Sequence, residues 1–156
     1  NSLFSDFMKI RKARPADAAV IAGFNRSLAW ETEKLWLNLV IVGRGVRALL
    51  KDTAKGTYFV AQRGSVIVGQ LLITDEWSDW RNGYFWWIQS VYVASEFRRD
   101  GVFRALYGHV EALARSRRDV CGLRLYVEKN NRRAHTTYER LGMRHTHYEI
   151  YETSFR

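Results

Sequence analysis

The chain has 156 residues, of which 47% are hydrophobic and 26% charged, so it can bury one sizeable core and is not a disordered chain. Its net charge of +9 favours partners rich in phosphate, which include nucleic acid and phosphorylated cofactors. The apolar runs are too short to cross a bilayer, and the first eight residues are too short and mixed for a signal peptide, so we expect no membrane partner and a cytoplasmic location. Residues 1–7 fit either a cloning remnant or a leading segment of a single domain over residues 1–156.

The hydrophobic pattern predicts strands and helices that alternate along the chain. In chain order we expect a strand over 8–13, a helix over 15–30 with a break near Asn25, a helix over 34–50, strands over 57–62 and 65–74 with a turn at Arg63-Gly64, a polar loop over 75–83, an aromatic-rich strand over 84–93, a helix over 102–117, a strand over 120–127, a helix over 131–141 and a final strand over 143–151. This order favours an α/β (α+β) fold, with a mixed sheet that is antiparallel in its early hairpins and contains one βαβ unit.

The segment 91–106 has the pattern of an anion site. A strand ending in Val91, Tyr92 and Val93 runs into a short basic turn that contains Gly101, and an amphipathic helix follows at once. The first N–H groups of a helix have no partner inside it, and the helix dipole adds partial positive charge there. Glycine lets a phosphate approach the backbone, and arginines 98, 99 and 104 add full charges. We therefore expect a phosphate or pyrophosphate ligand.

A second motif lies in the helix over 131–141. Asn131 can cap its start, Gly142 can end it, and Tyr138 lies between them on a helical face. The two motifs in this order resemble those of the Gcn5-related N-acetyltransferase (GNAT) family. The pyrophosphate loop of that family, Arg/Gln-x-x-Gly-x-Gly/Ala, is matched by Arg98-x-x-Gly101-x-Phe103. Its later helix, Asn-x-x-Ala-x-x-x-Tyr-x-x-x-Gly-hydrophobic, is matched at Asn131, Ala134, Tyr138, Gly142 and Met143.

The resemblance extends over residues 8–152 and implies a mostly antiparallel mixed sheet of about six to seven strands with about four helices. The strands over 84–93 and 120–127 would splay apart to admit a pantetheine arm. The implied cofactor is acetyl-CoA, and the expected assembly is a homodimer. The residues implied in cofactor binding are Val91, Val93, Arg98, Arg99, Asp100, Gly101, Val102, Phe103, Arg104, Asn131 and Ala134.

Three residues depart from the pattern of the family. Phe103 replaces a usual glycine or alanine, so its side chain must turn away from the pyrophosphate into the protein. Asp100 places a carboxylate near the anion and should point to solvent. Ser95 replaces a common proline.

The resemblance makes Tyr138 the catalytic residue, because a phenol can donate a proton to the departing thiolate when an amine attacks the thioester. The alternative is a tyrosine that packs on its helix. A general base is harder to assign, because the diamine acetyltransferases, which look closest, carry an acidic pair where this chain has Gln89 and Ser90. The remaining candidates are Glu33, Asp75, Glu76, Asp79 and Glu128, and each is also explained as a solvated surface carboxylate.

Four tryptophans at positions 77, 80, 86 and 87 fall within one short segment. Trp86 and Trp87 point to opposite faces of their strand, so one can be core while the other borders an acceptor cleft. An aromatic wall with nearby carboxylates suits a cationic amine. The residues expected at this acceptor site are Glu33, Asp79, Trp80, Trp87 and Gln89, with Glu31 as a further carboxylate.

Two other features favour structural roles. Cys121 is the single cysteine and lies in an apolar run, so we expect a small buried core residue. His145 and His147 would share one face of the final strand, but no third ligand is evident nearby, so we expect no metal.

The sequence therefore predicts an N-acetyltransferase acting by direct transfer to a small amine. Two alternatives stay open. One is acetylation of a macromolecular amine, on a protein or an aminoacyl-tRNA, which the net charge favours. The other is a non-catalytic module that binds acetyl-CoA and regulates through a partner. Nucleic acid is a less favoured partner, because no basic run interleaves with aromatics.

Overall fold

The computed structural model describes residues 7–156, and most of the leading segment considered above lies outside them. The chain divides into two compact units, one up to Leu125 and the other from Tyr126 to Arg156. None of the helices in residues 7–156 has the length and hydrophobicity required to span a bilayer. The expectation of a single domain stays a prediction.

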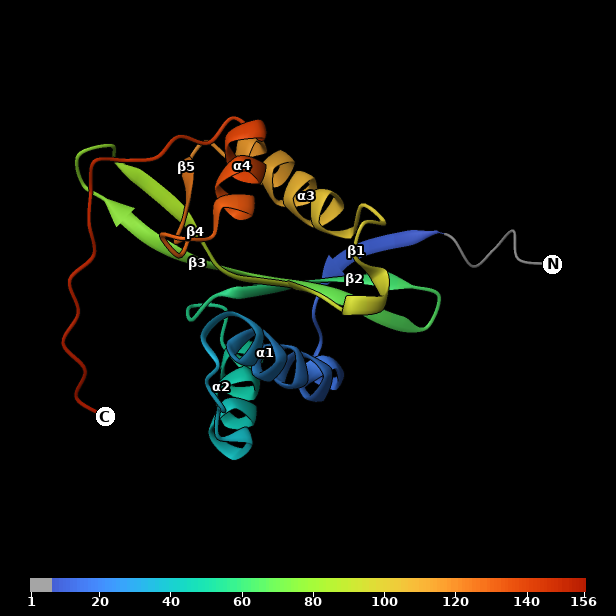
Figure 1. The fold of residues 1–156 in the computed structure, drawn as a ribbon. Coiled ribbons are helices and arrows are strands. Elements are labelled where there is room, and N and C mark those ends of the chain that lie inside the picture. The colour runs from blue at the N-terminus through green and yellow to red at the C-terminus, as the bar shows by residue number, and fades with distance from the viewer. Residues whose placement is uncertain (1–6) are drawn as a thin grey trace. The chain divides into compact units, whose positions relative to one another are not determined.

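The first unit contains a five-stranded sheet whose spatial order follows the sequence, β1-β2-β3-β4-β5 (Figure 1). The strands are β1 Met8–Lys12, β2 Thr57–Arg63, β3 Val66–Ser78, β4 Gly83–Val93 and β5 Val120–Leu125. Neighbours pair antiparallel except β4 and β5, which are parallel. The single parallel pair encloses a helical crossover, α3 (Val102–Ser116), as the βαβ pattern predicts.

Helices cover both faces of this sheet (Figure 1). They are α1 Ala18–Glu33, preceded by a 3-10 turn at Pro15–Asp17, α2 Leu39–Lys51 and α3 Val102–Ser116. On one face α1 and α2 pack over β2, in a core of Ala18, Ile21, Ala22, Val46, Tyr58 and Val60. On the other face the start of α3 lies so close to β3 that a β-carbon at Gly69 would come within 3.0 Å of the Val102 side chain. The absence of a side chain at Gly69 therefore lets the start of α3 pack directly on β3.

Strand β4 changes its pairing in the middle. Leu72 pairs with Ser90 and Ile73 pairs with Ile88, so Gln89 is an extra residue that forms a bulge. The pairing of β4 with β5 ends close to the bulge, at Ile88 and Leu125. The rest of β4, up to Val93, pairs with β3 alone. The expected separation of these two strands therefore begins at Gln89.

Three expectations about the first unit are wrong. The segment 75–83 is not a polar loop, because β3 continues to Ser78 and only a short turn follows, where Asn82 takes a φ of 48°. The rings of Trp77 and Tyr84 pack edge to face across the two strands, 5.0 Å between centroids, and this pair holds the longer hairpin. Helix α1 has no break at Asn25, whose amide donates to the Tyr58 hydroxyl instead of competing for the helix backbone.

The third wrong expectation concerns Cys121, which is exposed and not buried. It lies on β5, at the edge of the sheet, and its thiol donates to the Tyr84 carbonyl at 3.2 Å. An apolar run does not ensure burial at this position, because β5 is an edge strand of the described sheet and has a neighbouring strand on one side only.

The second unit contains α4, Arg132–Arg140. The Asn131 side chain accepts from the Ala134 N–H at 3.1 Å, and Gly142 ends the helix with a φ of 89°. The strand expected over 143–151 does not form. A strand needs a ladder partner, whereas residues 143–156 pair with none, and Tyr148, Ile150 and Tyr151 are exposed. The described sheet thus has five strands, slightly fewer than expected, in the expected mixed fold.

Candidate functional site

The loop between β4 and α3 has the geometry of an anion cradle. Two of its residues, Arg99 and Gly101, have left-handed φ angles of 69° and 79°. No side chain caps the start of α3, and the first helical bond runs from the Ala105 N–H to the Gly101 carbonyl at 3.0 Å. The N–H groups of Val102 and Arg104 precede that bond, so the helix offers them no acceptor. These donors are the ones that a phosphate group uses at a helix start.

The space in front of this loop is open. A β-carbon built on Gly101 meets no protein atom within 4 Å. The exposed side chains of Arg99 and Arg104 flank the opening in sequence and supply positive charge. The loop therefore fits the pyrophosphate of coenzyme A on three counts: N–H donors that precede the first helical bond, open space and positive charge.

The two loop side chains that differ from the family pattern, Asp100 and Phe103, both contact other protein groups. The Asp100 carboxylate pairs with Arg63 at 3.3 Å, and Arg63 also lies over the Phe97 ring, 5.7 Å from its centroid. Asp100 is thus exposed, as expected, yet its charge is partly balanced. Phe103 is half-buried with its ring 6.1 Å from that of Tyr107, one turn further along α3.

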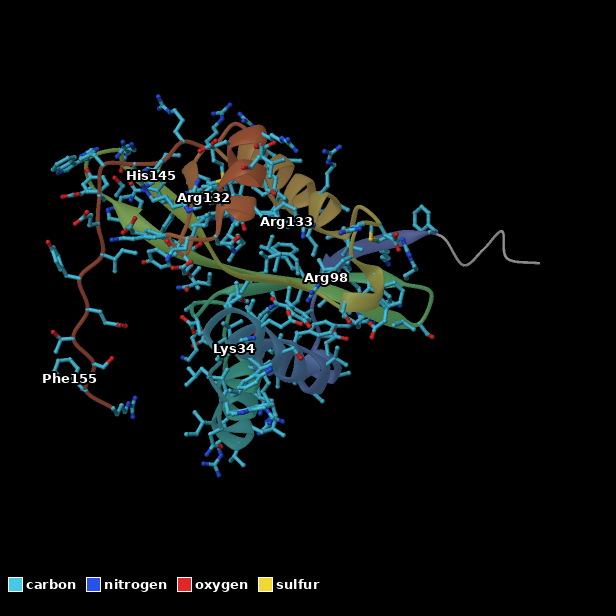
Figure 2. All side chains as sticks on the ribbon, viewed as in Figure 1. Lys34, Arg98, Arg132, Arg133, His145 and Phe155 are labelled. Carbon is cyan, nitrogen blue, oxygen red and sulfur yellow. The ribbon has the colours of Figure 1, made fainter. Side chains whose placement is uncertain are left out.

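The Arg98 guanidinium takes a direction that its motif does not reveal. Its Nη2 donates to the Glu31 carboxylate on α1 at 2.8 Å, and its Nε donates to the Val93 carbonyl at 3.0 Å. Figure 2 labels the Arg98 side chain beside the sheet. The group also lies 5.3 Å from the centroid of the Tyr92 ring, and the Tyr92 hydroxyl donates to the other Glu31 oxygen at 3.3 Å. The structure thus engages Arg98 with protein groups and places Glu31, expected near the acceptor, against the cofactor loop.

The end of β4 presents an open backbone edge toward this loop. Val91 and Val93 are half-buried, and the edge of Gln89–Val93 that would face β5 has no ladder partner within the described sheet. An extended chain carrying amide groups can pair with such an edge. The pantetheine arm of coenzyme A is a chain of this kind, and it would lead directly to the phosphate cradle.

The residues expected at the acceptor site fall in different places. Trp87 is half-buried and Gln89 is exposed, so these two flank the start of the open edge. Asp79 and Trp80 lie in the turn at the tip of the β3–β4 hairpin, where Trp80 is 87% exposed. Glu33 is exposed at the last position of α1. The structure therefore brings together the pair on β4 and leaves the hairpin tip as a separate surface.

Arg124 on β5 is a site residue that the sequence did not suggest. Its guanidinium stacks on Phe85 at 3.6 Å from the ring centroid and lies 5.9 Å from that of Trp87. It also pairs with Glu76 at 2.8 Å. Glu76, one of the candidate bases, is therefore held by a cation. A cation over Trp87 was not foreseeable, because only the parallel pairing of β5 brings Arg124 to that ring.

The second unit holds the other expected residues on α4. Tyr138 and Ala134 are half-buried, four residues apart on one helical face. Burial raises the pKa of the Tyr138 phenol above its ordinary value, because loss of water disfavours the charged form. The Asn131 side chain caps the helix. Of the candidate bases in this unit, Glu128 accepts from the Asn130 N–H at 2.8 Å. The ring of His145 lies 6.3 Å from that of His135, and no three metal-binding side chains gather among residues 7–156.

Comparison of the chain with known proteins identifies its family. The model of the acetyltransferase (GNAT) family matches residues 19–143. No curated protein matches the sequence. Among solved structures, a possible acetyltransferase from Clostridium difficile 630 shares 45% identity with a TM-score of 0.91, covering 96% of this chain and 98% of that one.

More distant structures share the fold alone. A ribosomal-protein-alanine N-acetyltransferase from Brucella melitensis biovar Abortus 2308 has 19% identity and a TM-score of 0.76, over 96% of this chain and 100% of that one. An aminoglycoside N-acetyltransferase in complex with CoA has 15% identity and a TM-score of 0.77, over 96% of each chain. The family model covers most of the chain and the 45% identical structure nearly all of it, so the chain belongs to the GNAT family of acetyltransferases.

Proposed function

We propose that this N-acetyltransferase moves the acetyl group of acetyl-CoA to the primary amine of a small molecule by direct attack. The observation that carries the proposal is the open phosphate cradle at the start of α3, reached along the unpaired edge of β4. Acetyl-CoA supplies the thioester carbon that the amine attacks. The diamine acetyltransferase-like character stays part of this proposal.

In this proposal, groups of the chain would have the following roles. The backbone N–H groups of residues 99–104 hold the pyrophosphate, and Val91 and Val93 pair with the pantetheine amides. Asn131 and Ala134 start the helix that carries Tyr138, and the Tyr138 phenol donates a proton to the departing sulfur. The raised pKa of Tyr138 supports this role, because the phenol stays protonated at neutral pH.

Direct transfer also requires that the acceptor amine lose its proton. Gln89 has no basic group, and the Glu76 carboxylate is paired with Arg124. Asp75 and Glu33 are exposed carboxylates. We therefore propose that a water chain, and not a dedicated carboxylate, takes the proton from the amine.

The experiment that tests the function is a screen of amine acceptors with release of the coenzyme A thiol as the readout. The panel contains a diamine, an amino-acid amide, an aminoglycoside and a basic peptide. Release above the rate without acceptor, for any small amine, supports the proposal. Tight acetyl-CoA binding with no release for any acceptor would favour the non-catalytic alternative.

The net charge of +9 favours one second candidate, acetylation of a macromolecular amine. Such an acceptor is an acidic protein or an aminoacyl-tRNA, which the positive charge would attract. The discriminating measurement is the salt dependence of the acceptor KM, since a polyanionic acceptor loses affinity steeply as salt rises. A small amine should show little change.

The hairpin tip gives a prediction about the acceptor. We expect Trp80→Ala to raise the acceptor KM about threefold to fivefold and to leave the acetyl-CoA KM unchanged, because an exposed cation–π contact is worth about that factor. Trp80→Phe keeps an aromatic face and should retain most of the affinity. Steady-state kinetics with each substrate varied in turn measures both constants. Equal changes in the two KM values, or none, would show that Trp80 has no acceptor role.

A further inference from the structure

The link between α1 and the cofactor loop joins residues that are distant in sequence. Glu31 lies in the last turn of α1, and its two carboxylate oxygens accept from Arg98 at 2.8 Å and from the Tyr92 hydroxyl at 3.3 Å. Tyr92 is buried and packs against Phe24 of α1, 5.2 Å between ring centroids. One carboxylate oxygen of Glu31 is thus bonded to the hydroxyl of the buried Tyr92 ring, and the other to Arg98 of the loop.

Arg98 connects Glu31 to the backbone of β4. Its Nε donates to the Val93 carbonyl at 3.0 Å, and its guanidinium plane lies over the Tyr92 ring. A planar guanidinium that makes a charge-assisted bond at one end has little freedom at the other. The two Arg98 bonds therefore link Glu31 to the last residue of β4, immediately before the loop that carries the N–H donors.

From these contacts we propose that Glu31 is a positioning residue for the cofactor site: it acts through Arg98 to fix the end of β4 and the phosphate loop in the binding geometry. The inference rests on the proposed use of acetyl-CoA. It also assigns the Arg98 side chain to the support of the loop, while the backbone N–H groups bind the anion.

This role and simple electrostatics predict opposite results for Glu31→Gln. The substitution removes a negative charge close to a loop that binds an anion, so Coulomb attraction alone would tighten acetyl-CoA binding. If Glu31 positions the loop, binding weakens instead, because the neutral amide loses the charge-assisted bond that orients Arg98. Since the pair is partly exposed, with 44% and 40% of the two side chains accessible, we expect a weakening of about threefold to fivefold.

The experiment measures acetyl-CoA affinity by calorimetry, together with steady-state kinetics, on the full chain. The variants are Glu31→Gln and Tyr92→Phe, which removes only the hydroxyl that donates to Glu31. Asp52→Asn removes an ion pair of similar length and exposure, 2.9 Å and 47%, far along the sequence from the loop, and should change nothing.

We expect Glu31→Gln to raise both the Kd and the KM of acetyl-CoA, with kcat changed less than about twofold. In an Arg98→Ala background the same substitution should have no further effect, because Glu31 acts through Arg98. A Glu31→Gln protein that binds acetyl-CoA as tightly as the native chain, or more tightly, overturns the inference. Additive effects of Glu31→Gln and Arg98→Ala overturn it as well. If Glu31→Gln fails to fold, Tyr92→Phe decides in the same way. Failure of the native chain to bind acetyl-CoA would instead overturn the proposed function.

Discussion

Replacing Gly101 with valine should lower the affinity for acetyl-CoA at least tenfold, or about 1.4 kcal/mol. Two causes act together. The φ of 79° at Gly101 is left-handed, and a branched side chain strains that conformation. The added side chain would also fill the open space in front of the loop, where a β-carbon now meets no protein atom within 4 Å. Calorimetry with acetyl-CoA measures the loss.

A matched control separates these two causes. Gly64, in the β2–β3 turn, has a φ of 61° and equally open space around its β-carbon. Gly64→Val should therefore cost similar stability in thermal unfolding. Gly64 also adjoins Arg63, the ion-pair partner of Asp100. This control therefore includes any effect that a change in the β2–β3 turn has on the loop through that ion pair. We expect Gly64→Val to keep its acetyl-CoA affinity. Unchanged affinity in a folded Gly101→Val protein would show that the loop is not the phosphate site.

The sequence predicted the strand-turn-helix geometry of the loop between β4 and α3 well, because its signal is local. Strand, basic turn, glycine and amphipathic helix follow one another within a few residues, and the structure places β4, the left-handed Gly101 and α3 accordingly. Periodicity also predicted most helices and strands, with errors of a few residues at their ends. The family motif on α4 was equally local, since Asn131 caps that helix and Gly142 ends it.

The predictions that were wrong, and the contacts that were not predicted, depend on residues that are distant in the sequence. Strand β3 is longer than its polar composition suggested, because Trp77 packs against Tyr84 across the hairpin. The contacts of Arg98 with Glu31 and of Arg124 with Phe85 each join residues from separate elements, and no spacing rule reveals them. The final strand was predicted from alternation alone, which cannot supply a ladder partner.

The Arg124 contact narrows the acceptor hypothesis. A cationic amine would be repelled by the guanidinium that lies over Phe85 and Trp87, unless the pairing of Arg124 with Glu76 offsets its charge. The exposed hairpin tip, with Asp79 and Trp80, offers an aromatic face and a carboxylate on a surface separate from Arg124. Trp80 is therefore the more informative position at which to test acceptor recognition.

Replacing Tyr138 with phenylalanine should lower kcat about a hundredfold and leave acetyl-CoA affinity nearly unchanged. Phenylalanine keeps the ring and its packing on α4 but lacks the proton that the departing sulfur would accept. General-acid help is worth about 10² to 10⁴ in rate, and a thiol is a fairly good leaving group, so we expect the lower end of that range. Tyr148→Phe removes an exposed hydroxyl from the same unit and should leave kcat unchanged.

The pH dependence makes the role of Tyr138 more specific. A general acid acts only while protonated, and burial raises the pKa of this phenol, so its protonated form persists well into the alkaline range. The ratio of native to Tyr138→Phe kcat should therefore stay constant from about pH 7 to pH 9, even as both rates rise with deprotonation of the amine. A ratio that falls steadily with pH over this range would mean that the phenol titrates there and that the raised pKa is wrong. A kcat loss of less than about threefold in a folded Tyr138→Phe protein would identify Tyr138 as a packing residue, and the thiolate would then leave without a protein proton.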